Sequence, residues 1–367
     1  MRATRDAVRA ARVSAQHLGV RLLAGQEAAA AASGLRDTPS RSARDALAAR
    51  VQAPVSQAGL MAVWGPRGAP YVVAAADLAV FTRGALPVDE ASARAFAPSA
   101  AKALAPTQIA LLDAFADVER VMRAAVADGP VERDDMHQRL REALPGALLW
   151  ACKGCGTRHV HPMIWRGACA MGAIRRDDAS RSRAVTYAAV AEAPDPSRDA
   201  VARAELIRRV LHHHGPLTLS ELAAWLSVTK PDARARLDAI AGELDELDRE
   251  GAPAWALAAD SELLAAPPAP RGVRLLGAAD PLLDGRDRAS LVPDPALQRE
   301  IWKALAGPGV VLADGQVVGT WRAKMIGRRL QVTPSALGAA RLPAAARLLP
   351  EAEALAAARG LTDATLA

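Results

Sequence analysis

Four side chains that prefer soft divalent metals lie close together near the middle of the sequence. Cys152 and Cys155 are separated by two residues and followed by Gly156, and His159 and His161 come shortly after. Two thiolates on a tight turn, followed by imidazoles on one face of a strand, have the spacing of a zinc knuckle. The alternative is a hairpin in which the cysteines act as small hydrophobic residues. Apart from a structural zinc at these residues, no cofactor is expected.

The basic side chains are almost all arginines. Lys and Arg number 46 against 40 Asp and Glu, for a net charge of +6, and only five of the 46 are lysines. Guanidinium groups bind phosphate bidentately, and excess positive charge favours polyanionic partners. The alternative is a generic arginine-rich surface. The candidate phosphate contacts are Arg41, Arg44, Arg50, Arg67, Arg322, Lys324, Arg328 and Arg329.

Composition excludes several classes of protein. Three cysteines cannot form a disulfide framework, and charges interrupt the apolar runs before they reach about 18 residues, the length of a membrane span. The first residues lack the apolar stretch of a secretory signal. Only 7 Trp, 2 Tyr and 3 Phe are available to stack single-stranded bases. We therefore expect a cytoplasmic protein that does not enter a membrane.

Most of the first 260 residues show alanine-rich helical patterns with short strand signals between them. After the linker-like segment 193–196, a helix to His212 is followed by Gly215-Pro216 and by a capping box formed by Thr218 and Glu221. Two further helical patterns and a short strand at 255–257 complete the layout of a winged helix. Weaker copies of this layout precede it, including a helix expected at 106–127 and another at 40–50.

The sequence becomes rich in Pro, Gly and β-branched residues after about residue 267. Apolar runs on both sides of Asp314-Gly315 predict a β-hairpin, and a final helix is expected from Pro343 to Arg359, ending at Gly360. The predicted fold is mainly α with small β elements. It comprises winged-helix units at 1–95, 96–192 and 193–264, and a small β-barrel-like module with a C-terminal helix at 265–367.

Five short motifs, taken in sequence order, resemble a bacterial winged-helix DNA-binding family that includes the AlkZ and YcaQ-like crosslink-repair DNA glycosylases. Together they span most of the chain. They are Gly34-Leu35-Arg36-Asp37-Thr38-Pro39; Trp64 with Arg67-Gly68-Ala69-Pro70; Gly215-Pro216; Asp280-Pro281 with Arg286-Asp287-Arg288 and Leu291-Val292-Pro293; and Asp314-Gly315 with Val318-Gly319-Thr320-Trp321-Arg322.

The resemblance implies three winged helices around a concave basic surface, a small β-barrel and double-stranded DNA as the partner. In active members, Gln, a middle residue and then Gln or Asp position the water that cleaves an alkylated purine from its sugar. The matching residues here are Arg36, Asp37 and Thr38, so an arginine replaces the first glutamine. The activity implied is that of a monofunctional DNA glycosylase acting on monoadducts or interstrand crosslinks, in DNA repair or self-resistance. A monomer is expected.

The chemistry of this bond indicates what each residue of the triplet could do. Its cleavage passes through an oxocarbenium-like state, which needs oriented water and nearby negative charge. Asp37 could supply both and Thr38 could hold the water, whereas Arg36 would repel the sugar cation but bind a flanking phosphate. Alternatively, Asp37 only caps the helix that follows it. A non-catalytic DNA-binding regulator or damage-sequestering protein is therefore the second hypothesis.

Overall fold

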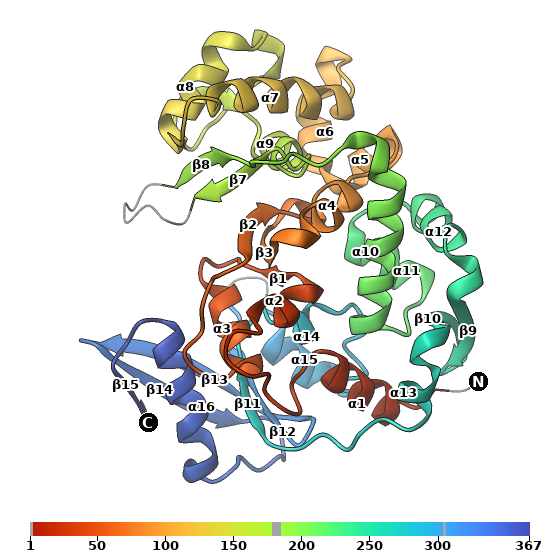
Figure 1. The fold of residues 1–367 in the computed structure, drawn as a ribbon, viewed down its shortest axis with the longest axis vertical. Helices are drawn as coiled ribbons and strands as arrows, with labels where there is room; N and C mark the ends of the chain where they lie inside the picture. The colour runs from red at the N-terminus through yellow and green to blue at the C-terminus, as the bar shows by residue number, and fades with distance from the viewer. Residues whose placement is uncertain (1–2, 178–184, 304–305) are drawn as a thin grey trace. The chain divides into compact units, whose positions relative to one another are not determined.

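The chain forms two compact units. The computed structural model describes residues 3–177, 185–303 and 306–367, and its fold is mixed α/β (Figure 1). The first unit is built from both ends of the chain together with a short central piece, and the second from the middle. Their ranges are Met1–Leu60, Arg208–Glu221 and Ala241–Ala367 for the first, and Met61–Ile207 and Leu222–Ile240 for the second. The four predicted domain boundaries stay a prediction.

A curled five-stranded sheet organises the first unit. Its strands follow the order β11-β12-β13-β14-β15, antiparallel except for the parallel pair β14 and β15. The strands are β11 (Val273–Leu276), β12 (Gly309–Ala313), β13 (Gln316–Ile326), β14 (Arg329–Ala336) and β15 (Asp363–Leu366). The other elements are α1 (Arg5–Ala15), α2 (Glu27–Ala30), β1 (Leu35–Arg36), α3 (Ser42–Arg50), α13 (Ser261–Ala265), α14 (Pro281–Asp284), α15 (Pro295–Ile301) and α16 (Ala345–Ala358).

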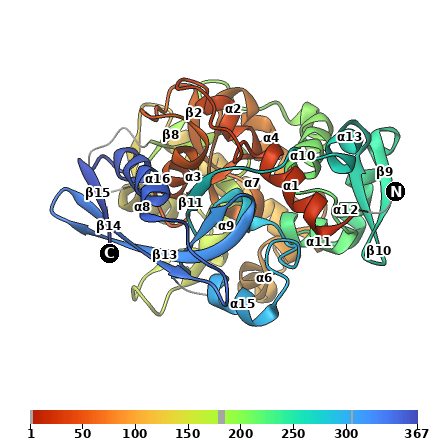
Figure 2. The same ribbon diagram turned by 90° about the horizontal axis from the view of Figure 1, so that it is seen from below.

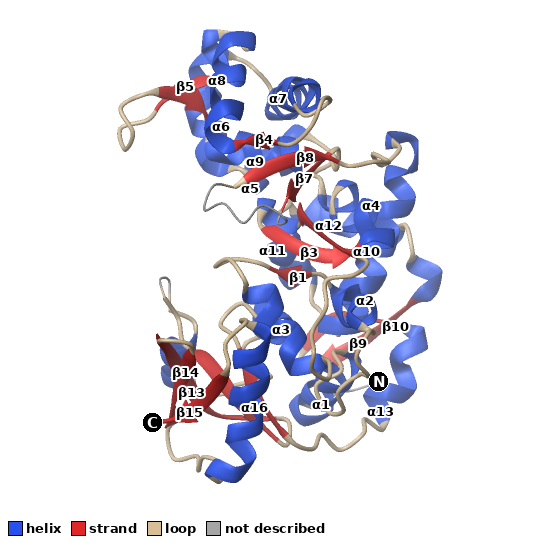
Figure 3. Cartoon of the chain, turned by 60° about the vertical axis from the view of Figure 1, so that its left-hand side comes forward, coloured by secondary structure: helices blue, strands red, loops and turns tan. Residues whose placement is uncertain are grey.

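Successive residues of a strand point to opposite faces, and β12 uses both faces of this sheet. Val311 packs with α16 in one core cluster, whereas Val310 and Leu312 pack with α14 and α15 in another. Helix α16 lies along β11 and beside α3 (Figures 2 and 3). Strand β12 is thus covered on both faces, which explains why it reads as a nearly continuous apolar run.

The hairpin turn and the end of the C-terminal helix lie where the sequence predicts them. Asp314 and Gly315 join β12 to β13, both with positive φ (47° and 77°), as a type I′ hairpin turn requires. Helix α16 ends two residues before Gly360, which has a φ of 73°. The predicted hairpin and C-terminal helix are therefore confirmed, but β13 and β14 are longer than the short strands expected.

The second unit packs short strands against helices. Its sheet contains strands in the order β3-β2-β7-β8-β4, and β5 and β6 form a separate hairpin. The strands are β2 (Leu60–Trp64), β3 (Pro70–Ala74), β4 (Val131–Glu132), β5 (Leu149–Ala151), β6 (Arg158–Val160), β7 (Ile174–Asp177) and β8 (Thr186–Ala189). The helices are α4 (Leu78–Phe81), α5 (Glu90–Phe96), α6 (Pro98–Leu104), α7 (Leu111–Ala125), α8 (Arg133–Ala143), α9 (Pro162–Cys169) and α12 (Lys230–Asp238).

Residues 199–257 show the predicted order of three helices followed by a hairpin. Helices α10 (Asp199–His214) and α11 (Leu219–Leu226) run from one unit into the other, α12 follows, and β9 (Leu244–Arg249) pairs with β10 (Ala252–Leu257). The capping box is present, because Thr218 N donates to Glu221 and Glu221 N donates to Thr218 Oγ1. None of the helices in the described part of the chain is long and apolar enough to cross a membrane.

Candidate active site

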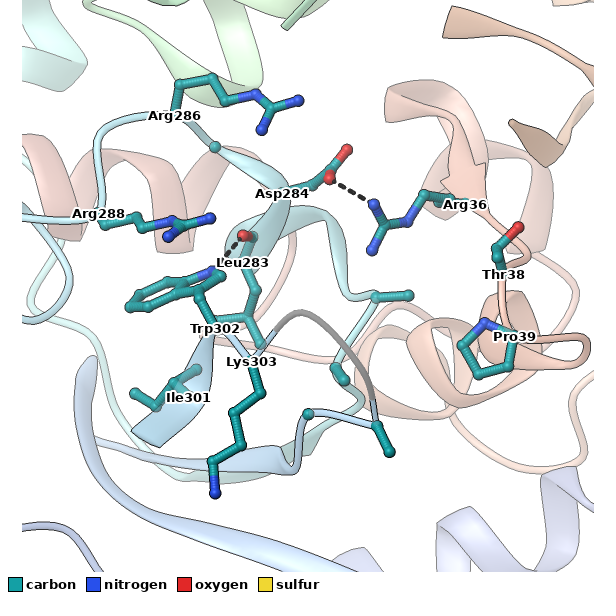
Figure 4. Close-up of a pocket in the computed structure, with 15 residues that line it drawn as sticks. Arg36, Thr38, Pro39, Leu283, Asp284, Arg286, Arg288, Ile301, Trp302 and Lys303 are labelled. Atoms are coloured by element: carbon teal, nitrogen blue, oxygen red, sulfur yellow. Dashed lines mark hydrogen bonds and ion pairs between the residues drawn. The ribbon is translucent and has the colours of Figure 1, made fainter. Parts of the chain in front are cut away.

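A cavity of about 700 Å³ lies within the first unit (Figure 4). Arg36 at the end of β1 and the residues that follow it line one side, residues 283–286 and Arg288 line another, and Ile301 to Lys303 line a third. The first of these segments is far from the other two in the sequence. Its volume is within the range of about 300–1,000 Å³ that is typical of small-molecule sites. The cavity therefore has room for one nucleotide-sized group.

The triplet after Gly34 contributes two of its three side chains to this cavity. Arg36 and Thr38 line it, whereas Asp37 does not. Adjacent side chains of extended chain point in opposite directions, so the residue between two cavity-facing positions turns inward. Asp37 is 6% exposed, and its Oδ1 accepts a hydrogen bond from Ala43 N in the first turn of α3. The geometry supports the capping alternative for Asp37 rather than a water-orienting role in this cavity.

The carboxylate that lines the cavity is Asp284, at the end of α14. Arg36 Nη1 donates to Asp284 Oδ1 at 3.0 Å, and the two side chains are 28% and 10% exposed, respectively. Figure 4 shows this pair between Thr38 and Arg286. Asp284 was not predicted as a site residue, although it lies between the two parts of the Asp280–Arg288 motif. The signal was weak, because nothing local indicates that Asp284 meets a residue 248 positions away.

A buried ion pair holds the helix that carries Asp284. Arg50 donates to both oxygens of Asp280, at 2.7 and 2.9 Å, and to Gln16 Oε1 at 3.1 Å. Both charged side chains are 0% exposed. Asp280 is also the N-cap of α14 and accepts from Leu282 N. The pair therefore fixes α14 against α3, which begins just after the triplet.

A second ion-pair network holds the segment beyond α14. Asp287 lies 3.2 Å from guanidinium nitrogens of both Arg12 and Arg249, and it accepts hydrogen bonds from Ser290. Burial alone raises the pKa of Asp287, but Arg12, Ser290 and Arg249 together lower it below its usual value. Asp280, Asp284 and Asp287 thus each bind an arginine from the N-terminal 50 residues: Arg50, Arg36 and Arg12.

The rest of the cavity lining is rich in cations. Arg286, Arg288 and Lys303 are exposed. The Arg288 guanidinium lies over the Trp302 ring, 5.1 Å from its centroid, and Trp302 Nε1 donates to Leu283 O at 2.9 Å. Guanidinium and ammonium groups at a cavity rim bind phosphate oxygens well. Arg286 and Arg288 belong to the fourth motif, but neither they nor Trp302 and Lys303 were expected from the sequence to be site residues.

One of the predicted phosphate contacts is wrong. Arg50 cannot reach a phosphate, because it is fully buried and bound to Asp280. The reason is that nearly all of α3 is covered, so its arginines do not share a solvent face. Arg44 is half-buried there, and Arg41 is exposed just before the helix.

The other predicted contacts stay predictions, and the structure places them as follows. Lys324 and Arg328 are exposed on the hairpin of β13 and β14. Arg322 donates to Ala306 O, and Arg329 forms an exposed ion pair with Asp363. In the second unit, Arg67 donates to Trp225 O and Tyr71 Oη. Arg67 therefore has a structural role.

The candidate metal ligands divide into a cluster and a separate residue. Cys152, Cys155 and one nitrogen of His159 have ligand atoms that all lie within 4.8 Å of one another in the second unit. Hydrogen bonds, above all from Thr157, lower the pKa of Cys155 to about 6. His161 is not part of this cluster. Its Nδ1 accepts a hydrogen bond from Met163 N at the start of α9.

Asp37 provides a test of the capping geometry. Replacing Asp37 with Ala is expected to lower the free energy of unfolding by about 1–3 kcal/mol, because Ala43 N would lose its acceptor in a buried place. Asp37→Asn keeps an acceptor oxygen and is expected to retain most of the stability. Urea unfolding followed by circular dichroism measures both. Equal losses in the two variants would show that the charge, not the hydrogen bond, matters.

Comparison with known proteins agrees with the resemblance drawn from the five motifs. The sequence profile of the family described as DNA glycosylase AlkZ-like matches residues 20–358. A relative from Streptomyces sahachiroi, named interstrand DNA cross-link repair glycosylase, is 32% identical over 189 residues. That alignment covers 47% of this chain and 47% of the relative, about half the length of each.

The fold also has a counterpart among solved structures. The Streptomyces sahachiroi DNA glycosylase AlkZ matches with a TM-score of 0.73 over 100% of both chains, at 23% sequence identity. This similarity concerns the fold alone. The family profile covers every one of the five motifs and most of the chain. The protein therefore belongs to the DNA glycosylase AlkZ-like family.

Proposed function

We propose that this protein binds duplex DNA and hydrolyses the N-glycosidic bond of a cationic, N3- or N7-alkylated purine. The observation that carries this proposal is the Arg36–Asp284 pair beside Thr38 in a cavity lined with cations. Family membership supports DNA as the substrate. The name of the Streptomyces relative makes interstrand crosslinks, besides monoadducts, a substrate to test.

The proposed reaction uses Asp284 rather than Asp37. The C1′–N bond breaks and its electron pair goes to the purine, which leaves as a neutral base because the alkyl group had made it cationic. Water then adds to C1′ and gives its proton to the Asp284 carboxylate, while Thr38 helps to hold the water. The products are a free alkylated base and an abasic site. The negative charge of Asp284 also stabilises the oxocarbenium-like state.

The proposed role of Arg36 follows from its partner. A guanidinium alone near C1′ would oppose the developing positive charge of the sugar. Bound to Asp284 at 3.0 Å, Arg36 has its charge largely offset and fixes the direction of the carboxylate. Arginine in place of the family's first glutamine is therefore compatible with hydrolysis.

The second candidate function is binding without catalysis. It is favoured by the same ion pair, because a carboxylate engaged by a guanidinium is a weaker base than one without such a partner. In this case the protein either sequesters damaged DNA or acts as a non-catalytic DNA-binding regulator. The DNA would be held by phosphate contacts, which fix position but carry no sequence information.

The experiment that tests the proposal is release of the base from a duplex carrying one N7-methylguanine, with spontaneous depurination as the baseline. A second duplex carrying an interstrand crosslink tests the larger substrate. Release above the baseline on either duplex supports the glycosylase. Salt-sensitive binding of both duplexes without release from either would support the second candidate. Absence of binding at low salt would contradict both.

The cavity cations provide a prediction about binding. Replacing Arg286, Arg288 and Lys303 by Ala in one triple variant is expected to make the negative slope of log K against log salt shallower by about 3. The reason is that each phosphate contact contributes about 0.9 to the magnitude of this slope. A matched variant with Ala at Arg94, Arg120 and Arg123, exposed arginines of the second unit, changes the net charge equally. Fluorescence anisotropy over a salt series measures both. Equal slopes for the two triple variants would mean that net charge, not the cavity, governs binding.

We also infer that residues 199–257 form a winged helix. The order of three helices and a hairpin, with the capping box at the start of α11, supports this inference. The two earlier winged-helix units and the β-barrel-like module are part of the same proposal, as are binding as a monomer and a cytoplasmic location.

A further inference from the structure

The hairpin of β5 and β6 brings together three groups of the kind that bind zinc. Its strands pair from Leu149–Val160 to Ala151–Arg158, so the six-residue turn 152–157 carries both Cys152 and Cys155. Cys152 N donates to Thr157 O and Gly156 N donates to Cys152 O, both at 3.0 Å. Gly156 has a φ of 69°, which closes the turn without the strain that a side chain would add. The backbone thus places both sulfurs on one side of the turn.

The tautomer of His159 leaves a nitrogen lone pair for a metal. His159 Nδ1 lies 2.8 Å from the backbone oxygen of Val160. A carbonyl oxygen only accepts, so Nδ1 carries the proton of the neutral ring and Nε2 keeps its lone pair. Metal-binding histidines are commonly oriented by such an Nδ1–H bond to a backbone carbonyl. His159 therefore already has the second-shell contact that a metal ligand needs.

His161 has the opposite tautomer. Its Nδ1 accepts from Met163 N at 3.1 Å, so the proton of the neutral ring is on Nε2. Neither ring nitrogen is then available to a metal unless the cap of α9 is lost. His159 and His161 both contact the Trp150 ring, with centroid distances of 5.7 and 5.1 Å. They therefore have similar surroundings and different hydrogen-bonding roles, which makes His161 a matched control.

We propose that Cys152, Cys155 and His159 bind one Zn²⁺, with water in the fourth position. In a tetrahedral site, bonds of about 2.3 Å to sulfur and about 2.1 Å to nitrogen place ligand atoms about 3.6–3.8 Å apart. The ligand atoms here lie within 4.8 Å of one another, so each pair needs to close by about 1.2 Å at most. Cys155 is exposed, while Cys152 and His159 are half-buried, and an ion can enter from solvent.

The metal would stiffen a hairpin that has little else to hold it. β5 has one half-buried and two exposed residues, and its partner β6 buries only Val160 among its three residues. His159 connects this hairpin to the helical core, because its ring contacts His137 of α8 at 5.3 Å, and His137 contacts Trp165 of α9 at 4.6 Å. A metal bound by His159 would therefore link the turn to α8. Its role is structural and does not depend on the proposed glycosylase activity.

The test uses the full-length protein, reduced and stripped of metal with a chelator, and titrated with Co²⁺ and then Zn²⁺. We expect thiolate-to-cobalt charge-transfer absorption and the visible bands of tetrahedral Co²⁺, saturating at one ion per chain and lost when Zn²⁺ is added. Cys152→Ser, Cys155→Ser and His159→Gln are each expected to weaken Zn²⁺ binding by about 100-fold or more, measured by competition with a chromophoric chelator.

His161→Asn is expected to bind both metals like the wild-type protein, because asparagine can cap α9 and His161 is not a ligand. Circular dichroism of each variant verifies that it folds. Two results would overturn the proposal: octahedral Co²⁺ spectra in the wild-type protein, or equal Zn²⁺ affinity in wild-type and Cys152→Ser proteins. A Cys152–Cys155 disulfide in the purified protein, with no Zn²⁺ binding after reduction, would instead indicate a redox pair and would also overturn it.

Discussion

Asp280→Ala is expected to lower the free energy of unfolding by about 3–5 kcal/mol, the usual loss when one partner of a buried ion pair is removed. Arg50 would keep its charge in a place with 0% exposure, and among the described residues it would retain Ala46 O and Gln16 Oε1 as acceptors. Helix α14 would lose its N-cap as well. The expected loss is a large fraction of the stability of a typical domain, about 5–15 kcal/mol.

Urea unfolding at neutral pH measures this effect, with a surface ion pair as the control. Asp363→Ala removes the partner of Arg329, and both side chains are about half exposed, so stability should barely change. The double replacement Arg50→Met with Asp280→Leu should recover much of the loss, because no charge then remains buried. If Asp280→Ala were as stable as Asp363→Ala, the Arg50–Asp280 pair would not be what holds α14.

Asp284→Asn is expected to lower base release by about 10²–10⁴-fold, the usual contribution of a positioned general base. Asparagine matches the shape of Asp284 and can still accept a hydrogen bond from Arg36, but it cannot take a proton from water. Binding of the damaged duplex should stay equal or become tighter, because a negative charge leaves a cavity lined with Arg286, Arg288 and Lys303. Base release is therefore expected to fall while the affinity for the damaged duplex does not.

Asp37→Asn is the matched control, since it changes the neighbouring carboxylate in the same way. It should release base at nearly the wild-type rate, because Asp37 faces α3 and not the cavity. Single-turnover base release and anisotropy on the same N7-methylguanine duplex measure both variants. Loss of activity in Asp37→Asn with full activity in Asp284→Asn would restore the assignment made from the sequence.

Much of the fold could be predicted from local sequence signals. The Asp314-Gly315 hairpin, the Thr218–Glu221 capping box and the helix ending before Gly360 are set by residues within a few positions of one another. Such contacts depend on short-range sterics and hydrogen bonding, which the pattern of residue types expresses directly. The sequence grouped Cys152, Cys155, His159 and His161 for the same reason, and the structure brings the first three together without His161.

The candidate site could be predicted only in part, because its two sides come from opposite ends of the chain. The resemblance selected Arg36 and Thr38, but the sequence could not indicate that Asp37 turns inward. Arg50 has the spacing of a surface residue on a helix, and only the packing of α3 shows that it is buried. Asp284 has only a weak local signal, since its role depends on a partner 248 residues away.

The division of the first unit between both ends of the chain has a consequence during protein synthesis. At about 5–20 residues per second, the ribosome needs about 12–50 s to progress from Arg36 to Asp284. From the synthesis of Arg50 onward, Arg12, Arg36 and Arg50 are present in the nascent chain without the carboxylates that later bind them. A nascent chain that ends before Gly307 lacks part of the cavity lining.

The core of the second unit is different, because its large apolar cluster is formed by residues from Trp64 to Tyr187. This cluster is complete in the nascent chain well before the first unit can close. The order of translation therefore favours folding of the middle segment first. The N-terminal segment can pack into the first unit only after the C-terminal part of that unit has been synthesised. Residues 3–60 would therefore remain longest without their partners, and the candidate active site would form only after the apolar core of the second unit is complete.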